Sequence, residues 1–81
     1  MTYEEIYEKL KILIADFFAI DAGTLNKESS ALHVDGWDSI GHVMLIIEIE
    51  AYFSVTLNGD DALQVGNIGE LAGLIFKSGK P

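Results

Sequence analysis

The sequence is short of two residue types: none of its 81 residues is cysteine, and only five are lysine or arginine. Without cysteine, neither a disulfide framework nor a thiolate metal site is available. Against 13 acidic residues, the five basic ones leave a formal net charge of −8. This charge disfavours binding to nucleic acid or to an anionic membrane surface, because either would require a basic patch. The acidity suits a basic protein partner, or it serves solubility alone.

Targeting and membrane-spanning patterns are missing as well. Residues 1–5 lack the basic start and the apolar run of a secretory signal. The longest apolar stretch, residues 43–47, is far too short to cross a bilayer. We therefore expect a cytoplasmic, monomeric protein without membrane insertion.

The composition suffices for one small folded domain. Hydrophobic residues make up 49% of the chain, which is enough for a core despite the charge. A length of 81 residues allows a single domain over residues 1–81, and we expect residues 77–81 to form a frayed tail.

The apolar spacing predicts three main helices and one short helix. The first spans residues 2–18, with Thr2 and Glu5 placed as a capping box. Residues 59–64 form the short helix, and residues 68–77 form the last one. The apolar residues that we expect to face the core of the first and last helices are Ile6, Leu10, Leu13, Ile14, Phe17, Leu71, Leu74 and Ile75. Asn67 and Glu70 are placed as a second capping box.

The remaining main helix begins at Asp38-Ser39 and follows a long loop, residues 19–37. Such a loop is functional or structured in so small a domain, and Leu25, Leu32 and Val34 are its expected anchors into the core. The fold predicted is an all-α bundle with one long loop between helices one and two. The expected buried stripe of the second helix consists of Ile40, Val43, Leu45, Ile46, Ile49 and Phe53.

Residues 36–43 (GWDSIGHV) are the most informative stretch, because they lie where the loop meets a helix N-terminus. Backbone N–H groups and the positive end of the helix dipole favour a phosphate attached to a hydroxyl there. Gly36 gives the backbone freedom before the turn. The alternative is simple capping, since both Asp38 and Ser39 are good N-cap residues.

Residues 36–53 resemble the acyl/peptidyl carrier protein family. The hallmark Gly-x-Asp-Ser-Leu/Ile is matched by Gly36, Asp38, Ser39 and Ile40. The helix order, the long first loop and the position of Asn67 extend the resemblance over nearly the whole chain. The downstream matches are Val43, Leu45, Ile46, Ile49, Glu50 and Phe53.

The resemblance implies that Ser39 takes up a covalent 4′-phosphopantetheine arm. A phosphopantetheinyl transferase would supply the metal and base, while the Ser39 hydroxyl attacks the pyrophosphate of coenzyme A. The arm's thiol would then carry acyl or aminoacyl groups as thioesters between a loading enzyme and downstream synthase or transferase enzymes. The chain itself would not be an enzyme.

The second helix also indicates which partners the carrier meets. Fatty-acid-type carriers show several acids on this helix, whereas here only Glu48 and Glu50 are acidic. This favours a specialised lipid, polyketide or nonribosomal peptide-type pathway. The residues expected to contact partners are Asp38, Ile40, His42, Met44, Ile47 and Glu48. Trp37 either packs the loop onto the bundle or borders the arm, and His42 is expected at the surface.

Two other functions remain open at this level. Met44 and Ile47, one turn apart, fit an unmodified helical interaction module. Ser39, His42 and Asp38 superficially suggest a small serine hydrolase. The nucleophile elbow Gly-x-Ser-x-Gly is not matched, however, because two residues separate Gly36 from Ser39.

Overall fold

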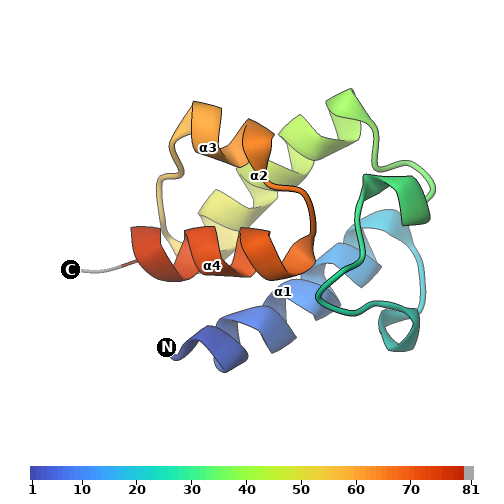
Figure 1. Cartoon of the computed structure of the whole chain (residues 1–81), viewed down its shortest axis with the longest axis horizontal. Helices are drawn as coiled ribbons and strands as arrows, with labels where there is room; N and C mark the ends of the chain where they lie inside the picture. The colour runs from blue at the N-terminus through green and yellow to red at the C-terminus, as the bar shows by residue number, and fades with distance from the viewer. Residues whose placement is uncertain (80–81) are drawn as a thin grey trace.

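The computed structural model describes residues 1–79, which form an all-α fold of three main helices and one short helix. Figure 1 shows α1 and α4 lying antiparallel along the length of the molecule, with α2 behind them and α3 above α4. No strand occurs in the described range. The predicted fold class is therefore confirmed. The elements in chain order are α1 (Tyr3–Phe18), the 3₁₀ turns η1 (Ala22–Thr24) and η2 (Ala31–His33), α2 (Ser39–Phe53), α3 (Gly59–Gln64) and α4 (Ile68–Ser78).

The starts of α1 and α4 follow the predicted caps with one difference. At α1, Glu5 N–H donates to Thr2 Oγ1 (3.2 Å) and Thr2 N–H donates to Glu5 Oε1 (2.8 Å), so this capping box is confirmed. At α4, Asn67 Oδ1 accepts from Glu70 N–H (2.8 Å). The Glu70 carboxylate binds Gly66 N–H (2.7 Å) instead of closing a box on Asn67.

The frayed tail expected over residues 77–81 is wrong for its first residues, because Lys77 and Ser78 belong to α4. Helix α4 continues to Ser78 and ends at Gly79, whose N–H donates to the Ile75 carbonyl. Residues 80–81 lie outside the described part of the chain.

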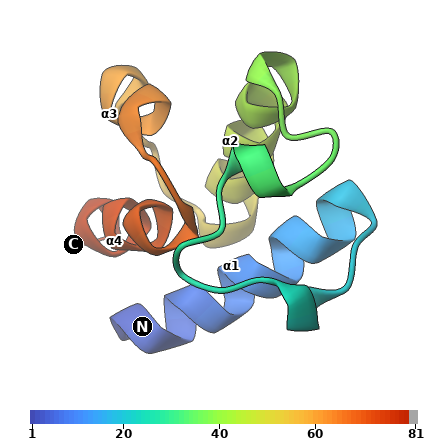
Figure 2. The ribbon, with the colours of Figure 1, turned by 45° about the vertical axis from the view of Figure 1, so that its right-hand side comes forward.

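The core lies where α1 packs against both α4 and α2. Each fully buried leucine or isoleucine contributes roughly 1.5–3 kcal/mol relative to exposure, so this three-helix contact supplies most of the stability. In the view of Figure 2, α3 stands apart from α1. The largest fully buried side chains are Leu10, Ile14, Leu45, Ile49, Ile68, Leu71 and Ile75.

The buried stripe predicted for α2 is wrong at its beginning. Leu45, Ile49 and Phe53 are buried, but Ile40 is 75% exposed and Val43 is 50% exposed. Apolar residues occupy nearly the whole circumference of α2, so spacing alone does not select the inner face. Ile40 therefore does not fix the first turn of α2 into the core.

The long loop is anchored at two of the three predicted positions. Leu25 and Val34 are buried, whereas Leu32 is 94% exposed. Backbone bonds also tie this loop to the start of α4, where Ile68 N–H donates to the Ser29 carbonyl and Gly69 N–H to the Lys27 carbonyl, both at 2.9 Å. Backbone pairing has no signature in side-chain pattern, so the sequence does not reveal this attachment.

Candidate functional site

Ser39 is the first residue of α2 and is exposed at the end of the long loop. Gly36 turns the chain there with a φ of +90°, in the left-handed region that favours glycine. The Gly36 carbonyl then lies against Gly41 in the first turn of α2, where a Cβ would collide with it. Gly41 is a requirement that sequence reasoning missed; a glycine inside a helix pattern was the available signal.

Asp38, not Ser39, caps α2. Asp38 Oδ1 accepts from Gly41 N–H (2.8 Å), and the Asp38 carbonyl accepts from His42 N–H (2.8 Å). Within the described chain, the amides of Ser39 and Ile40 at the head of the helix are left for a ligand. A phosphate on Ser39 Oγ fits this position, because it meets free N–H groups and the positive end of the dipole.

Trp37 and His42 form a stacked pair beside Ser39. Trp37 is buried, and its ring stacks on Phe18 (centroids 5.8 Å apart) and on His42 (6.1 Å). Trp37 Nε1–H donates to His42 Nδ1 (2.9 Å), and His42 Nε2 lies 2.7 Å from the Ala62 carbonyl. An indole N–H only donates, so the His42 proton is on Nε2 and is donated to Ala62. Trp37 thus packs the loop onto the bundle.

These contacts exclude the hydrolase arrangement. Both ring nitrogens of His42 are already occupied, and the Asp38 carboxylate is used by Gly41 N–H. Neither His42 nor Asp38 bonds to Ser39 in the described part of the chain, so the two do not form a serine-base-orienter line with it. His42 is half-buried and is a structural link, not the surface residue that the sequence suggested.

Two neighbouring hollows lie on this side of α2. An open groove of about 500 Å³ borders Ser39 and runs between Trp37 and Leu63. A second hollow of about 230 Å³ adjoins it between α2 and α3, with an almost wholly apolar lining that includes Val43, Ile47 and Leu63. Trp37 therefore lies beside Ser39, the expected attachment point of the arm, and also packs the loop onto the bundle.

The outward face of α2 is apolar. Ile40, Val43, Met44 and Ile47 are all exposed there, on the side opposite the buried Leu45, Ile49 and Phe53. Of the two acids on this helix, Glu50 accepts a hydrogen bond from Leu57 N–H (2.8 Å), whereas Glu48 is exposed. The expected partner residues other than His42 thus lie on the surface, next to Ser39 and further along α2. Leu63 of α3, which sequence reasoning missed, is exposed beside Val43 and extends this apolar surface onto α3. Leu32 of η2, expected as a core anchor, is exposed as well.

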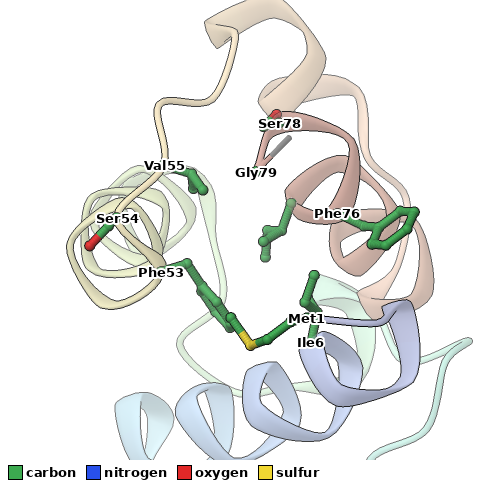
Figure 3. A pocket seen from close by; sticks show the side chains of 9 residues that line it. Met1, Ile6, Phe53, Ser54, Val55, Phe76, Ser78 and Gly79 are labelled. Carbon is green, nitrogen blue, oxygen red and sulfur yellow. The ribbon is translucent and has the colours of Figure 1, made fainter. Parts of the chain in front are cut away.

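A third hollow, of about 220 Å³, lies at the opposite end of α2. Figure 3 shows Phe53, Val55, Met1 and Ile6 around it, while the ring of Phe76 points away from it. A 15-residue helix is about 22 Å long, so this hollow is remote from Ser39. None of the predicted site residues lines it.

Residues 1–79 contain no group of three or more His, Cys, Asp or Glu side chains arranged to hold a metal. In the same range, no helix is long and apolar enough to cross a membrane. An exposed serine at a capped helix start, free amides beside it and an apolar surface around it define a class of protein: small helical domains that carry a group on a flexible arm.

Comparisons with known proteins identify that class. A family model described as "Phosphopantetheine attachment site" matches residues 8–75. The acyl carrier protein of Clostridium acetobutylicum is 34% identical over 70 residues, covering 86% of this chain and 91% of that protein. The acyl carrier protein of Lactobacillus acidophilus is 31% identical over 75 residues, covering 93% and 94%.

Solved structures agree with the sequence matches. The solution NMR structure of holo acyl carrier protein from Geobacter metallireducens superposes with a TM-score of 0.79 at 29% identity, covering 89% of this chain and 83% of that one. The acyl carrier protein from Enterococcus faecalis has the same fold, with a TM-score of 0.76 at 24% identity over 96% of this chain and 99% of that one.

The chain belongs to the acyl carrier protein family. It carries acyl groups as thioesters on a covalently attached 4′-phosphopantetheine, and it is a carrier, not a catalyst. Membership of this family implies interaction with a phosphopantetheinyl transferase and with acyl-handling enzymes. The hydrolase interpretation is therefore wrong, and the unmodified interaction module is not favoured.

Proposed function

We propose that Ser39 is the residue that takes up the 4′-phosphopantetheine arm and that residues 1–81 act as one carrier domain. The observation that carries this proposal is the division of roles at the start of α2. Asp38 does the capping through Gly41 N–H, so the Ser39 hydroxyl is left exposed for chemistry. A serine needed as a cap would not be available in this way.

The modification would proceed through the Ser39 hydroxyl. It attacks the pyrophosphate of coenzyme A, phosphopantetheine is transferred to Ser39 Oγ, and adenosine 3′,5′-bisphosphate leaves. The transferase must supply the base, because His42 is bound to Trp37 and Ala62. The product's charged phosphate would lie beside the amides of Ser39 and Ile40, an arrangement that contributes about 0.3–1 kcal/mol at an exposed helix start.

The surface around Ser39 indicates how partner enzymes would approach. We propose that Ile40, Met44 and Ile47 provide apolar contacts with the phosphopantetheinyl transferase, the loading enzyme and the downstream synthase or transferase. Asp38 and Glu48 supply the few charges at the edge of this surface. His42 would act on partners indirectly, through the elements that it connects.

The apolar character of this surface also bears on the pathway. Ile40, Met44 and Ile47 are exposed where an electrostatic recognition helix would present acids. We therefore propose a specialised lipid, polyketide or nonribosomal peptide-type pathway, with acyl or aminoacyl cargo. We propose a cytoplasmic location, where coenzyme A, the donor of the arm, is available. We also propose that the carrier acts as a monomer.

Intact-mass measurement tests the attachment residue. The protein is incubated with coenzyme A and a promiscuous phosphopantetheinyl transferase, and we expect a mass gain of one phosphopantetheine. Ser39→Ala should abolish the gain. Ser54→Gly is the matched control, because Ser54 is an exposed serine at the other end of α2 whose φ of 55° suits glycine. No gain in the wild type, or a gain in Ser39→Ala, would refute the proposal.

A further inference from the structure

Helix α3 has little of its own to hold it in place. It has six residues, Gly59–Gln64, and only Ala62 among them is buried. Leu63, its one large apolar side chain, is 69% exposed. A helix of this length is unstable in isolation, because nucleation is unfavourable and few hydrogen bonds follow it. Its position beside Ser39 must therefore come from contacts with other elements.

One such contact is made by His42. The Ala62 carbonyl is among the last four of α3, which have no partner within the helix. His42 Nε2–H donates to that carbonyl at 2.7 Å, across a sequence separation of 20 residues. The bond crosses the end of the apolar hollow that α2 and α3 form, since both His42 and Ala62 line that hollow.

The His42 ring is fixed on its other side by Trp37. Trp37 Nε1–H donates to His42 Nδ1 at 2.9 Å, which leaves the ring proton on Nε2, where Ala62 accepts it. Trp37 is buried, and its ring stacks on Phe18 at the end of α1. A continuous series of contacts thus runs from α1 through the loop and α2 to α3.

We propose that His42 is a positioning residue that fastens α3 to α2 beside the foot of the arm. The bond to Ala62 keeps Leu63 next to Val43 and Ile47, and so sets the shape of the apolar hollow that adjoins the groove at Ser39. This inference rests on the proposed role of Ser39 for its functional meaning, but the linkage itself is independent of modification.

Two conservative variants separate the two halves of the link. In His42→Asn, the side-chain oxygen lies near the place of Nδ1 and can still accept from Trp37, but the side chain is too short to reach Ala62. In His42→Gln, the side-chain amide lies near the place of Nε2 and can still donate to the Ala62 carbonyl. The proposal requires the glutamine, not the asparagine, to preserve α3.

Amide hydrogen exchange of the unmodified protein, resolved by residue, provides the measurement. We expect the α3 amides of His42→Asn to exchange on the order of tenfold faster, as for the loss of one hydrogen bond. His42→Gln should stay within about twofold of wild type. The amides of Leu71 and Ile75 in α4 report whether each variant is folded, and His33→Asn, in the exposed 3₁₀ turn η2, is the matched histidine control.

The proposal would be overturned by unchanged α3 exchange in His42→Asn, or by equal acceleration in the asparagine and glutamine variants. The second result would assign the effect to loss of the imidazole ring and its stacking on Trp37, because the asparagine keeps the Trp37 hydrogen bond and the glutamine keeps the Ala62 bond. Because exchange is measured without coenzyme A, failure here leaves the mass-gain test of Ser39 unaffected. A protein that gains no phosphopantetheine while showing the predicted exchange pattern would refute only the attachment proposal.

Discussion

The two halves of this carrier are stabilised in different ways. Helices α1 and α4 face each other through fully buried leucines and isoleucines, among them Leu10, Ile14, Leu71 and Ile75. At the Ser39 end, α3 buries one alanine, contacts α4 and accepts the hydrogen bond from His42. Apolar side chains there, including Leu63, point outward. The half formed by α1 and α4 thus provides the stability. The Ser39 end keeps its apolar surface exposed for partners and cargo.

The difference between the two halves should be largest in the free energy of unfolding of core variants. Leu71→Ala should lower the free energy of unfolding by about 2–5 kcal/mol, because it removes a fully buried side chain and leaves a cavity. Leu63→Ala, the same change on α3, should stay within about 0.5 kcal/mol because Leu63 is 69% exposed. Urea denaturation followed by far-UV circular dichroism measures both. Equal losses in the two variants would contradict this division.

The junction between the loop and α2 should show the next largest effect. A Cβ at Gly41 would collide with the Gly36 carbonyl, so Gly41→Ala should lower stability by about 1–3 kcal/mol. Gly59→Ala is the matched control, since a Cβ there meets nothing within 4 Å. That variant should be neutral or more stable by up to about 1 kcal/mol. Thermal unfolding of the two proteins side by side decides the matter, and a tolerated Gly41→Ala would mean that the junction is loose.

The exposed half should respond in partner assays while its stability is unchanged. Ile47→Ala should raise the KM of a partner enzyme for the carrier by roughly tenfold, as for an apolar anchor worth more than 1 kcal/mol. Its unfolding free energy should change by less than about 0.5 kcal/mol because the side chain is exposed. Glu48→Gln is the variant for comparison, because it removes the charge of an exposed acid next to Ile47.

Steady-state kinetics of phosphopantetheine transfer, at low and at high salt, distinguish the two kinds of recognition. We expect Glu48→Gln to change KM by less than about twofold, with weak dependence on ionic strength. A larger effect of Glu48→Gln than of Ile47→Ala would show that recognition is electrostatic. It would also remove the main support for a specialised pathway.

Prediction from sequence succeeds where the determinants are local. The ends of α1 and α2 follow from Thr2, Glu5 and Asp38, whose side chains bond amides only three residues away. The Ser39 motif is local in the same sense, so its position at a helix start was predictable. Gly36, with its positive φ, is a further case.

Prediction fails where tertiary contacts decide the outcome. The burial of Leu45 and the exposure of Ile40 and Val43 depend on which side of α2 meets α1, and an almost uniformly apolar helix does not encode that choice. The bond from His42 to Ala62 depends on the fold bringing α3 to α2. Such pairs are invisible to periodicity, and this one lies beside the candidate site.

The smallest expected effect lies at the far end of the stable half, in the capping box of α1. The hydrogen bond from the Thr2 backbone N–H is the larger cause, and the one with the Thr2 side chain the smaller, of a Glu5 pKa below the ordinary value of a glutamate. A carboxyl whose folded pKa is lowered contributes stability above its unfolded pKa and loses that contribution as the pH falls through the folded value. Glu5→Gln should therefore be less stable than wild type near neutral pH, and the gap should close on acidification.

Thermal midpoints at about pH 7 and about pH 3 test this, with the window set by the ordinary glutamate pKa. Glu28→Gln is the matched control, since Glu28 is an exposed acid of the long loop. The difference between Glu28→Gln and wild type should be the same with and without Thr2→Ala. Thr2→Ala should narrow the pH-dependent gap seen for Glu5→Gln without closing it, because the backbone N–H of residue 2, the larger cause, remains. A gap of unchanged size in Thr2→Ala would show that the Thr2 side chain contributes nothing to it, and that the backbone N–H and the helix dipole account for the stabilisation.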